Sequence, residues 1–142
     1  MTTVSPDLAT ASTEFVERVR VRYGECDQQG VVFNANYLAY ADDVIGQWFN
    51  AVIGSWAESG FDCMVKKATI EWSSPAKSGD IIEFRPSVTR WGNTSFDITI
   101  RATVEGRHVV DILLVYVSTV PGKNTPCPVP ANIRAGLSSR QD

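Results

Sequence analysis

A carboxylate that could act in acyl chemistry lies at Asp27, inside a polar turn at residues 24–30. The apolar step Val31-Val32-Phe33 leads from this turn into a long amphipathic segment. The first N–H groups of a helix lack intrahelical partners, and the helix dipole favours negative charge close to them. An acid or base beside such N–H groups is the minimal apparatus for acyl transfer. The turn and the helix start therefore predict a reaction site.

Each candidate group also has a structural interpretation. An Asp in a turn of this type more often bonds its own backbone two residues on than it acts in catalysis. Cys26 could be a nucleophile by type, but it has no nearby base, so we expect a buried small residue there. His108, the only histidine, is expected to be a solvated turn residue. With one His and three scattered Cys, no metal site is predicted.

The elements that must position these groups can be traced along the chain. Alternating apolar residues predict a half-buried strand at residues 14–23. Residues 34–52 predict a helix whose apolar arc covers more than half its circumference. Asp42 lies at the edge of the polar arc, so its side chain either faces a pocket or is solvated. Strands follow at residues 61–73, 81–91, 94–104 and 109–120, and a short helix near residues 130–137. The apolar run in the last strand predicts a central strand covered on both faces.

This order predicts an α+β fold in which a long helix lies on a five-stranded antiparallel sheet. The 142 residues suit one domain, at residues 1–142, with a disordered lead expected at 1–13 and a tail at 121–142. The charge of −3 argues against a binder of the nucleic-acid backbone. No apolar run approaches the roughly 18 residues of a membrane span. No signal peptide is recognised, and an odd number of unpaired cysteines suits a reducing cytoplasm.

The run G-E-C-D-Q-Q-G-V-V-F-N-A-N-Y-L-A-Y-A-D resembles the D-x-D-x-x-G-hydrophobic-V-x-x-x-N-Y motif of a known family. This family is the hotdog-fold acyl-CoA thioesterases of the 4-hydroxybenzoyl-CoA and Tol-Pal-associated branch. The later stretch A-T-I-E-W-S-S-P-A-K-S-G-D-I-I-E-F is similar to the family's strand, Pro-containing turn and G-D. The resemblance extends over about residues 15–120.

The resemblance implies a long central helix wrapped by a curved sheet. It also implies homodimers that join their sheets, often paired into tetramers, with active sites at the subunit interface. The family's catalytic carboxylate matches Asp27, and its carbonyl-polarising amide falls at Asn34. Glu25 stands where the family usually has Asp, and Asn34 stands where relatives carry His or Tyr. Some relatives carry a basic cluster where this chain has Gly92-Asn93-Thr94.

The predicted function is hydrolysis of an acyl- or aryl-CoA thioester to the free acid and coenzyme A, with no cofactor. Asp27 would act as a general base or would attack the carbonyl to give a mixed anhydride, and both routes stay open. The alternative is a non-catalytic acyl-CoA-binding hotdog domain; a hydratase, which requires an Asp/His pair, is the weaker rival. The predicted substrate-binding residues are Gly30, Val31, Phe33, Asn36, Tyr37, Asp42, Val65, Lys66, Arg90, Asn93, Thr94 and Ser95.

Overall fold

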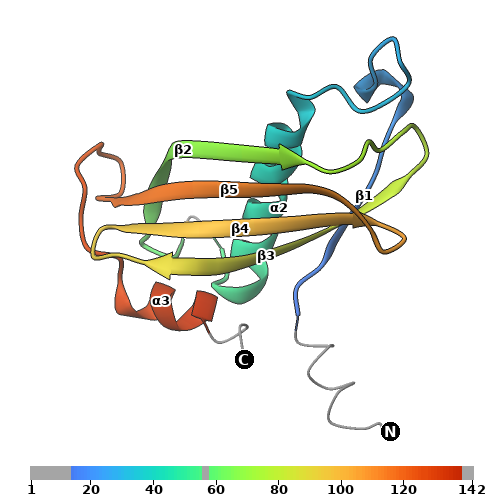
Figure 1. Cartoon of the computed structure of the whole chain (residues 1–142). Helices are drawn as coiled ribbons and strands as arrows, with labels where there is room; N and C mark the ends of the chain where they lie inside the picture. The colour runs from blue at the N-terminus through green and yellow to red at the C-terminus, as the bar shows by residue number, and fades with distance from the viewer. Residues whose placement is uncertain (1–13, 56–57, 139–142) are drawn as a thin grey trace, which may run out of the picture.

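A curved antiparallel sheet packs around one long helix in the computed structural model, which describes residues 14–55 and 58–138 (Figure 1). The elements are β1 (Glu17–Arg20), the 3-10 helix η1 (Tyr23–Glu25), α2 (Asn36–Val52), β2 (Asp62–Trp72), β3 (Ile81–Trp91), β4 (Ser95–Val104), β5 (Arg107–Thr119) and α3 (Ala131–Ser138). The strand order is β1-β3-β4-β5-β2, with every neighbouring pair antiparallel. The predicted α+β class and five-stranded sheet are confirmed.

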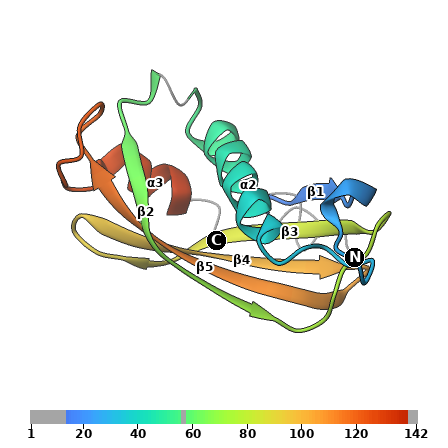
Figure 2. The ribbon, with the colours of Figure 1, turned by 90° about the horizontal axis from the view of Figure 1, so that it is seen from above.

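The helix α2 lies against the concave face of the sheet, and α3 lies on the same side (Figure 2). The apolar arc predicted for this helix is the face that is buried. Aromatic rings dominate this contact: the Tyr40 ring meets the Phe84 ring edge-on with centroids 5.8 Å apart. Burial of large aromatic side chains is the main source of stability in such a layer. The buried residues of α2 are Tyr37, Tyr40, Ala41, Val44, Ile45, Trp48 and Phe49.

The first strand is shorter than the alternating pattern predicts. β1 ends at Arg20, and Val21 exchanges its backbone hydrogen bonds with the loop before β3: its N–H donates to the Asp80 carbonyl at 2.8 Å and its carbonyl accepts from the Gly79 N–H at 2.9 Å. The chain then turns into η1, which leaves Tyr23 86% exposed. The apolar–polar alternation thus continues beyond the residues that pair in the sheet.

The last strand also differs from its prediction. β5 is an inner strand, between β4 and β2, as predicted, but it is not covered on both faces. Its side chains alternate: those facing α2, such as Ile112, are buried, whereas Leu113 and Val115 on the outer face are partly exposed. The apolar run therefore does not indicate burial on both faces in a single chain.

The tail folds back onto the sheet and contains the short helix that the sequence predicted. The helix α3 buries Ile133 and Leu137, and the Arg134 guanidinium lies 5.1 Å from the centroid of the Trp91 ring. The predictions for residues 1–13 lie outside the described residues. No described helix is both long and apolar enough to cross a membrane.

Candidate active site

The Asp27 turn is a tight loop closed by backbone hydrogen bonds. The Asp27 N–H donates to the Val31 carbonyl at 2.9 Å, and the Gly30 N–H donates to the Asp27 carbonyl at 3.0 Å. Gly30 has φ of +81°, a conformation that L side chains rarely adopt. The Gln29 N–H donates to Asp27 Oδ1 at 2.8 Å, so the predicted Asx-turn is present. The side chain is nevertheless exposed, and no described residue bonds Oδ2, which leaves that oxygen available for chemistry.

Glu25 ties this turn to α2. Its carbonyl accepts hydrogen bonds from the Phe33 N–H at 3.0 Å and from Asn36 Nδ2 at 2.8 Å. Its carboxylate accepts from Tyr40 Oη at 2.9 Å, and from the Arg22 backbone N–H at 2.9 Å and Nη2 at 2.7 Å. The hydrogen bond from the Arg22 side chain is the main cause that lowers the pKa of Glu25. The Glu25 carboxylate therefore fixes the turn onto the helix.

The N–H groups of the two residues just before α2 are free to bind a substrate oxygen. α2 begins at Asn36, two residues later than predicted, because the Asn36 N–H closes a short turn onto the Phe33 carbonyl at 2.9 Å. Among the described residues, no hydrogen bond is donated by the N–H of Asn34 or of Ala35. Free N–H groups at this end of a helix can stabilise a developing oxyanion.

A pocket of about 270 Å³ opens beside the helix start. Three predicted site residues, Val31, Asn34 and Tyr37, come together in its wall. Trp72 at the end of β2 adds an apolar ring to the wall, with its centroid 6.3 Å from that of Tyr37. Asn36 does not line this pocket, since its side chain is bonded to the Glu25 carbonyl. The pocket is lined by Val31, Val32, Asn34, Tyr37, Trp72, Ser73, Ser74 and Pro75.

Farther along α2, a second pocket of about 300 Å³ brings Asp42 and Val65 together at the seam between helix and sheet. Asp42 therefore faces a pocket, which was one of its two predicted interpretations. Cys63 and Tyr116 also line it. Burial raises the pKa of the Cys63 thiol to about 12, with a smaller contribution from the Asp62 charge. This pocket is therefore mostly apolar, with one carboxylate at its rim.

The hairpin residues predicted to bind coenzyme A lie elsewhere. The β3–β4 hairpin is at the end of β3 opposite to the loop that contacts the Asp27 turn (Figure 1). Its Arg90 pairs with Asp97 at 2.9 Å and bonds Ser95 Oγ at 3.0 Å. The Asn93 carbonyl accepts from the Val129 N–H at 3.0 Å. One chain does not bring Arg90, Asn93, Thr94 and Ser95 to Asp27, because the 11 residues of β3 separate them by about 33 Å.

Two other predicted residues are exposed at the surface. Phe33 is 52% exposed just before the helix. Lys66 is exposed at the β2 bulge, on the edge of the sheet. Cys26 is half-buried against the core cluster, close to the expected small-residue role.

The expectation that His108 is a solvated turn residue is wrong. His108 lies in β5 and is half-buried, and its Nε2 is 3.0 Å from Asp111 Oδ1. Its Nδ1 is 3.4 Å from Ser73 Oγ. Sequence reasoning missed this group because 35 residues separate Ser73 from His108, and only the pairing of β2 with β5 joins them. Within the described residues, no cluster of His, Cys, Asp and Glu could hold a metal ion.

Comparison with known proteins places the chain in a family. Residues 29–110 match the Thioesterase superfamily. The acyl-CoA thioester hydrolase YbgC of Escherichia coli is 28% identical over 129 residues, which cover 87% of this chain and 96% of that protein.

Solved structures agree on the fold. A thioesterase from Thermus thermophilus, complexed with coenzyme A and Zn, superposes with a TM-score of 0.79 at 25% identity and covers 89% of this chain and 92% of its own. A 1,4-dihydroxy-2-naphthoyl-CoA thioesterase from Synechocystis superposes with a TM-score of 0.77 at 16% identity, over 90% and 98% of the two chains. The chain described here belongs to the thioesterase superfamily and has its hotdog fold.

Proposed function

We propose that this protein is an acyl-CoA thioesterase whose reaction is carried out at the Asp27 turn. The observation that carries the proposal is an exposed carboxylate in a turn that is bonded to Val31 and Phe33, directly before the unbonded N–H groups of Asn34 and Ala35, in a chain of the thioesterase superfamily. The reaction releases a free acid and coenzyme A. The similarity to YbgC over 87% of the chain supports the same substrate class.

Two routes use the same groups. In one, Asp27 takes a proton from a water, and the water oxygen attacks the thioester carbon. In the other, the Asp27 carboxylate attacks that carbon, releases the thiolate and forms a mixed anhydride that water hydrolyses. In both routes the Asn34 N–H would hold the carbonyl oxygen as it gains charge, an interaction worth roughly 3 kcal/mol for one such donor.

The acyl group would occupy the apolar space along α2. The pocket beside Tyr37 and Trp72 has aromatic walls, and the Asp42 pocket continues the seam between helix and sheet. Such walls suit an aryl or a medium acyl group. Gly30, Val31 and Phe33 would border the reacting carbonyl, since they connect Asp27 to the helix start.

A homodimer would complete the site for coenzyme A. β2 is an edge strand, paired only with β5, and two copies can join their sheets through it. Antiparallel pairing of two β2 strands sets the Asp62 end of one copy, beside its hairpin, next to the Trp72 end of the other. Lys66 from the shared edge and Arg90, Asn93, Thr94 and Ser95 from the second copy's hairpin would then be near the coenzyme.

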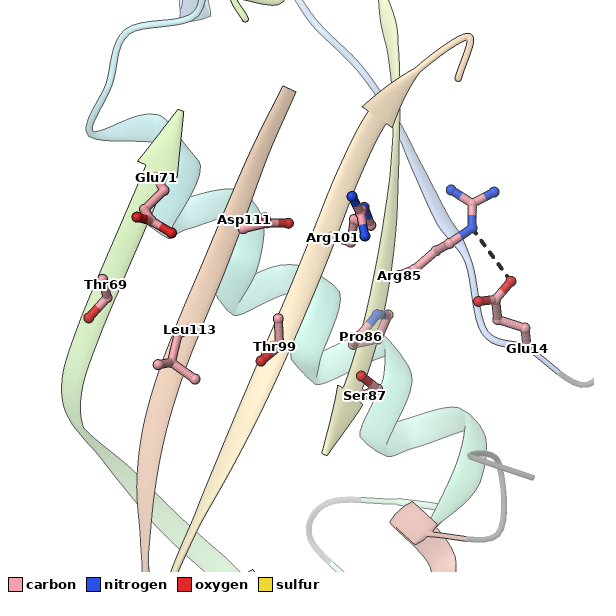
Figure 3. Close-up of a pocket in the computed structure, with 10 residues that line it drawn as sticks. All are labelled: Glu14, Thr69, Glu71, Arg85, Pro86, Ser87, Thr99, Arg101, Asp111 and Leu113. Atoms are coloured by element: carbon pink, nitrogen blue, oxygen red, sulfur yellow. Dashed lines mark ion pairs between the residues drawn. The ribbon is translucent and has the colours of Figure 1, made fainter. Parts of the chain in front are cut away.

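The outer face of the sheet supports further pairing into a tetramer (Figure 3). A groove of about 530 Å³ there has Arg85 and Arg101 on β3 and β4, and Glu71 and Asp111 on β2 and β5. In the described part of the chain, Arg101 and Glu71 have no ion-pair partner. A two-fold axis through this face would place the arginines of one copy on the carboxylates of the other. We also place the protein in the cytoplasm and treat residues 1–142 as one domain.

The first test removes the reacting carboxylate. Asp27→Asn is expected to lower kcat for acyl-CoA hydrolysis by about 10²–10⁴-fold, because the base or nucleophile is lost. Thiol release would be measured with a coloured thiol reagent across a panel of acyl- and aryl-CoA thioesters. The dissociation constant of a non-hydrolysable analogue would be measured by calorimetry and is expected to change little.

The matched control is Asp43→Asn, an exposed carboxylate of α2 that lines neither pocket. It should keep wild-type turnover. Near-normal turnover in a folded Asp27→Asn variant would show that the catalytic assignment is wrong. Binding without turnover by the wild-type protein on the whole panel would favour the acyl-CoA-binding module instead.

A further inference from the structure

A serine, a histidine and an aspartate form a hydrogen-bonded chain outside the Asp27 turn. Ser73 Oγ lies 3.4 Å from His108 Nδ1, and His108 Nε2 lies 3.0 Å from Asp111 Oδ1. Ser73 directly follows β2, whereas the other two residues belong to β5. The proposed thioesterase reaction uses none of these three side chains.

Hydrogen bonds of neighbouring residues hold the end of β2 against the start of β5. The N–H groups of Ser73 and Ser74 donate to the Val109 carbonyl at 2.7 and 3.2 Å. Ser74 Oγ donates to the His108 carbonyl at 2.6 Å and accepts from Arg107 Nη1 at 2.6 Å. These bonds keep Ser73 next to His108 without using the Ser73 hydroxyl or the His108 ring.

The order of the three groups suits a nucleophile and its base. An ionised Asp111 carboxylate can only accept, so it keeps the imidazole proton on Nε2. The lone pair of Nδ1 then faces the Ser73 hydroxyl and can take its proton. A base oriented by a third group is the arrangement that activates serine in hydrolases of unrelated folds.

Ser73 is also accessible from a substrate pocket. Its side chain is exposed, and the residue lines the same 270 Å³ pocket as Asn34, whose N–H is free among the described residues. A carbonyl in this pocket would have both a nucleophile and a hydrogen-bond donor among the residues that line it. Those are the two requirements for acyl transfer to serine.

We propose that Ser73, His108 and Asp111 form a second nucleophilic site that hydrolyses small activated oxygen esters independently of Asp27. Ser73 Oγ attacks the ester carbon and gives its proton to His108 Nδ1. The bond from carbon to the leaving oxygen breaks, and His108 returns the proton to the departing alcohol. Water then attacks the acyl-serine, loses its proton to His108, and releases the acid as Ser73 Oγ is reprotonated.

The experiment uses a fluorophosphonate probe, which phosphonylates activated serines, together with hydrolysis of 4-nitrophenyl acetate. We expect one adduct, located at Ser73 by peptide mass spectrometry, and none in Ser73→Ala. His108→Gln retains a donor toward Asp111 but lacks the base at the Nδ1 position. It is expected to slow labelling and ester hydrolysis at least about tenfold, at the low end of general-base contributions.

Two further variants separate this site from its surroundings. Ser78→Ala changes an exposed serine of the same loop and should label like the wild-type protein. Asp27→Asn should keep the Ser73 adduct, even if the thioesterase proposal fails. The proposal is overturned by a wild-type protein without an adduct at Ser73, by equal labelling in a folded His108→Gln variant, or by ester hydrolysis that disappears in Asp27→Asn.

Discussion

At the residue scale, Glu25 and Asp27 lie two positions apart and have opposite surroundings. The Glu25 carboxylate accepts bonds from Tyr40 and Arg22, and its side chain is 18% exposed. The Asp27 side chain is exposed, and within the described ranges its carboxylate accepts a hydrogen bond only from the Gln29 N–H. A carboxylate saturated with donors is a poor base, whereas one with a free oxygen can take a proton. This contrast supports the proposal that Glu25 positions the turn and Asp27 reacts.

Glu25→Gln should misplace the Asp27 turn. The amide loses the charge-assisted bond from Arg22, so we expect unfolding to become easier by about 1 kcal/mol at pH 7. Misplacement of the reacting carboxylate should lower kcat by about tenfold to a hundredfold. Denaturant unfolding and thiol release would measure both, with the exposed Glu58→Gln as control. Unchanged kcat would exclude a positioning role.

The same residue predicts a pH dependence. Because the folded-state pKa of Glu25 is lowered, its stabilisation is present above the unfolded value of about 4.3 and is lost as pH falls through the folded value. Wild-type protein should therefore lose more stability below about pH 4.3 than Glu25→Gln does.

Cys63 should be the least reactive thiol in its native surroundings. With a pKa of about 12, almost none of it is thiolate at pH 8. A variant that keeps only this cysteine, Cys26→Ser/Cys127→Ser, should react with a disulfide reagent at least about tenfold more slowly when folded than in denaturant. Equal rates in the two states would mean that the pocket is open to the reagent.

At the scale of elements, the sequence was most informative where turn chemistry is local. Ser-Pro and Gly-Asp before β3 and Gly-Asn after it placed that strand at its observed bounds, Ile81–Trp91. The alternation before the Asp27 turn predicted too long a first strand. Periodicity shows which way side chains face, but not which residues pair by hydrogen bonds. The turn around Asp27 and the start of α2 are close in sequence, so the hydrogen bonds that join them were predictable. The contact of Ser73 with His108 depends on strand order, which no local pattern encodes.

The helix α3 packs against the hairpin end of the sheet. Trp91 lies under Arg134, and its Nε1 donates to Ser138 Oγ at 3.0 Å. Ile133 is fully buried in this contact. Ile133→Ala is expected to cost about 2–5 kcal/mol of unfolding free energy, measured in urea. The control is Asn132→Ala, on the exposed side of the same helix. An effect as small as that of the control would mean that α3 is not packed as described.

At the scale of the whole molecule, the surface along β2 is the feature that a single chain leaves unexplained. Val65 and Trp72 are 47% and 48% exposed on the helix side of this edge strand, and Leu38 of α2 is 45% exposed beside the helix start. Exposed apolar side chains on an unpaired edge are typical of surfaces that associate with another chain, which supports the proposed homodimer. A second copy joined at β2 would bury them and would also bring its hairpin toward the Asp27 end.

Ala68→Lys tests this arrangement. Ala68 is exposed near the middle of β2, and the change makes a run of three lysines at positions 66–68. In an antiparallel pair of β2 strands, the lysine run of one copy would lie opposite the lysine run of the other. Like charges opposite one another destabilise strand pairing. We expect the dimer dissociation constant to rise at least about tenfold, or 1.4 kcal/mol, in analytical ultracentrifugation. Asn124→Lys adds the same charge on the exposed tail and should leave the dimer intact.

The activity of the same variant connects assembly to chemistry. If the hairpin of the second copy holds coenzyme A, the monomeric Ala68→Lys protein should have a raised KM for acyl-CoA. The KM for a short thioester that lacks the nucleotide should rise less. Higher protein concentration should restore the dimer and the KM together, because both follow from one association equilibrium. A monomer with wild-type KM would show that one chain binds the coenzyme alone, and Lys66 and the hairpin would then have no part in the site.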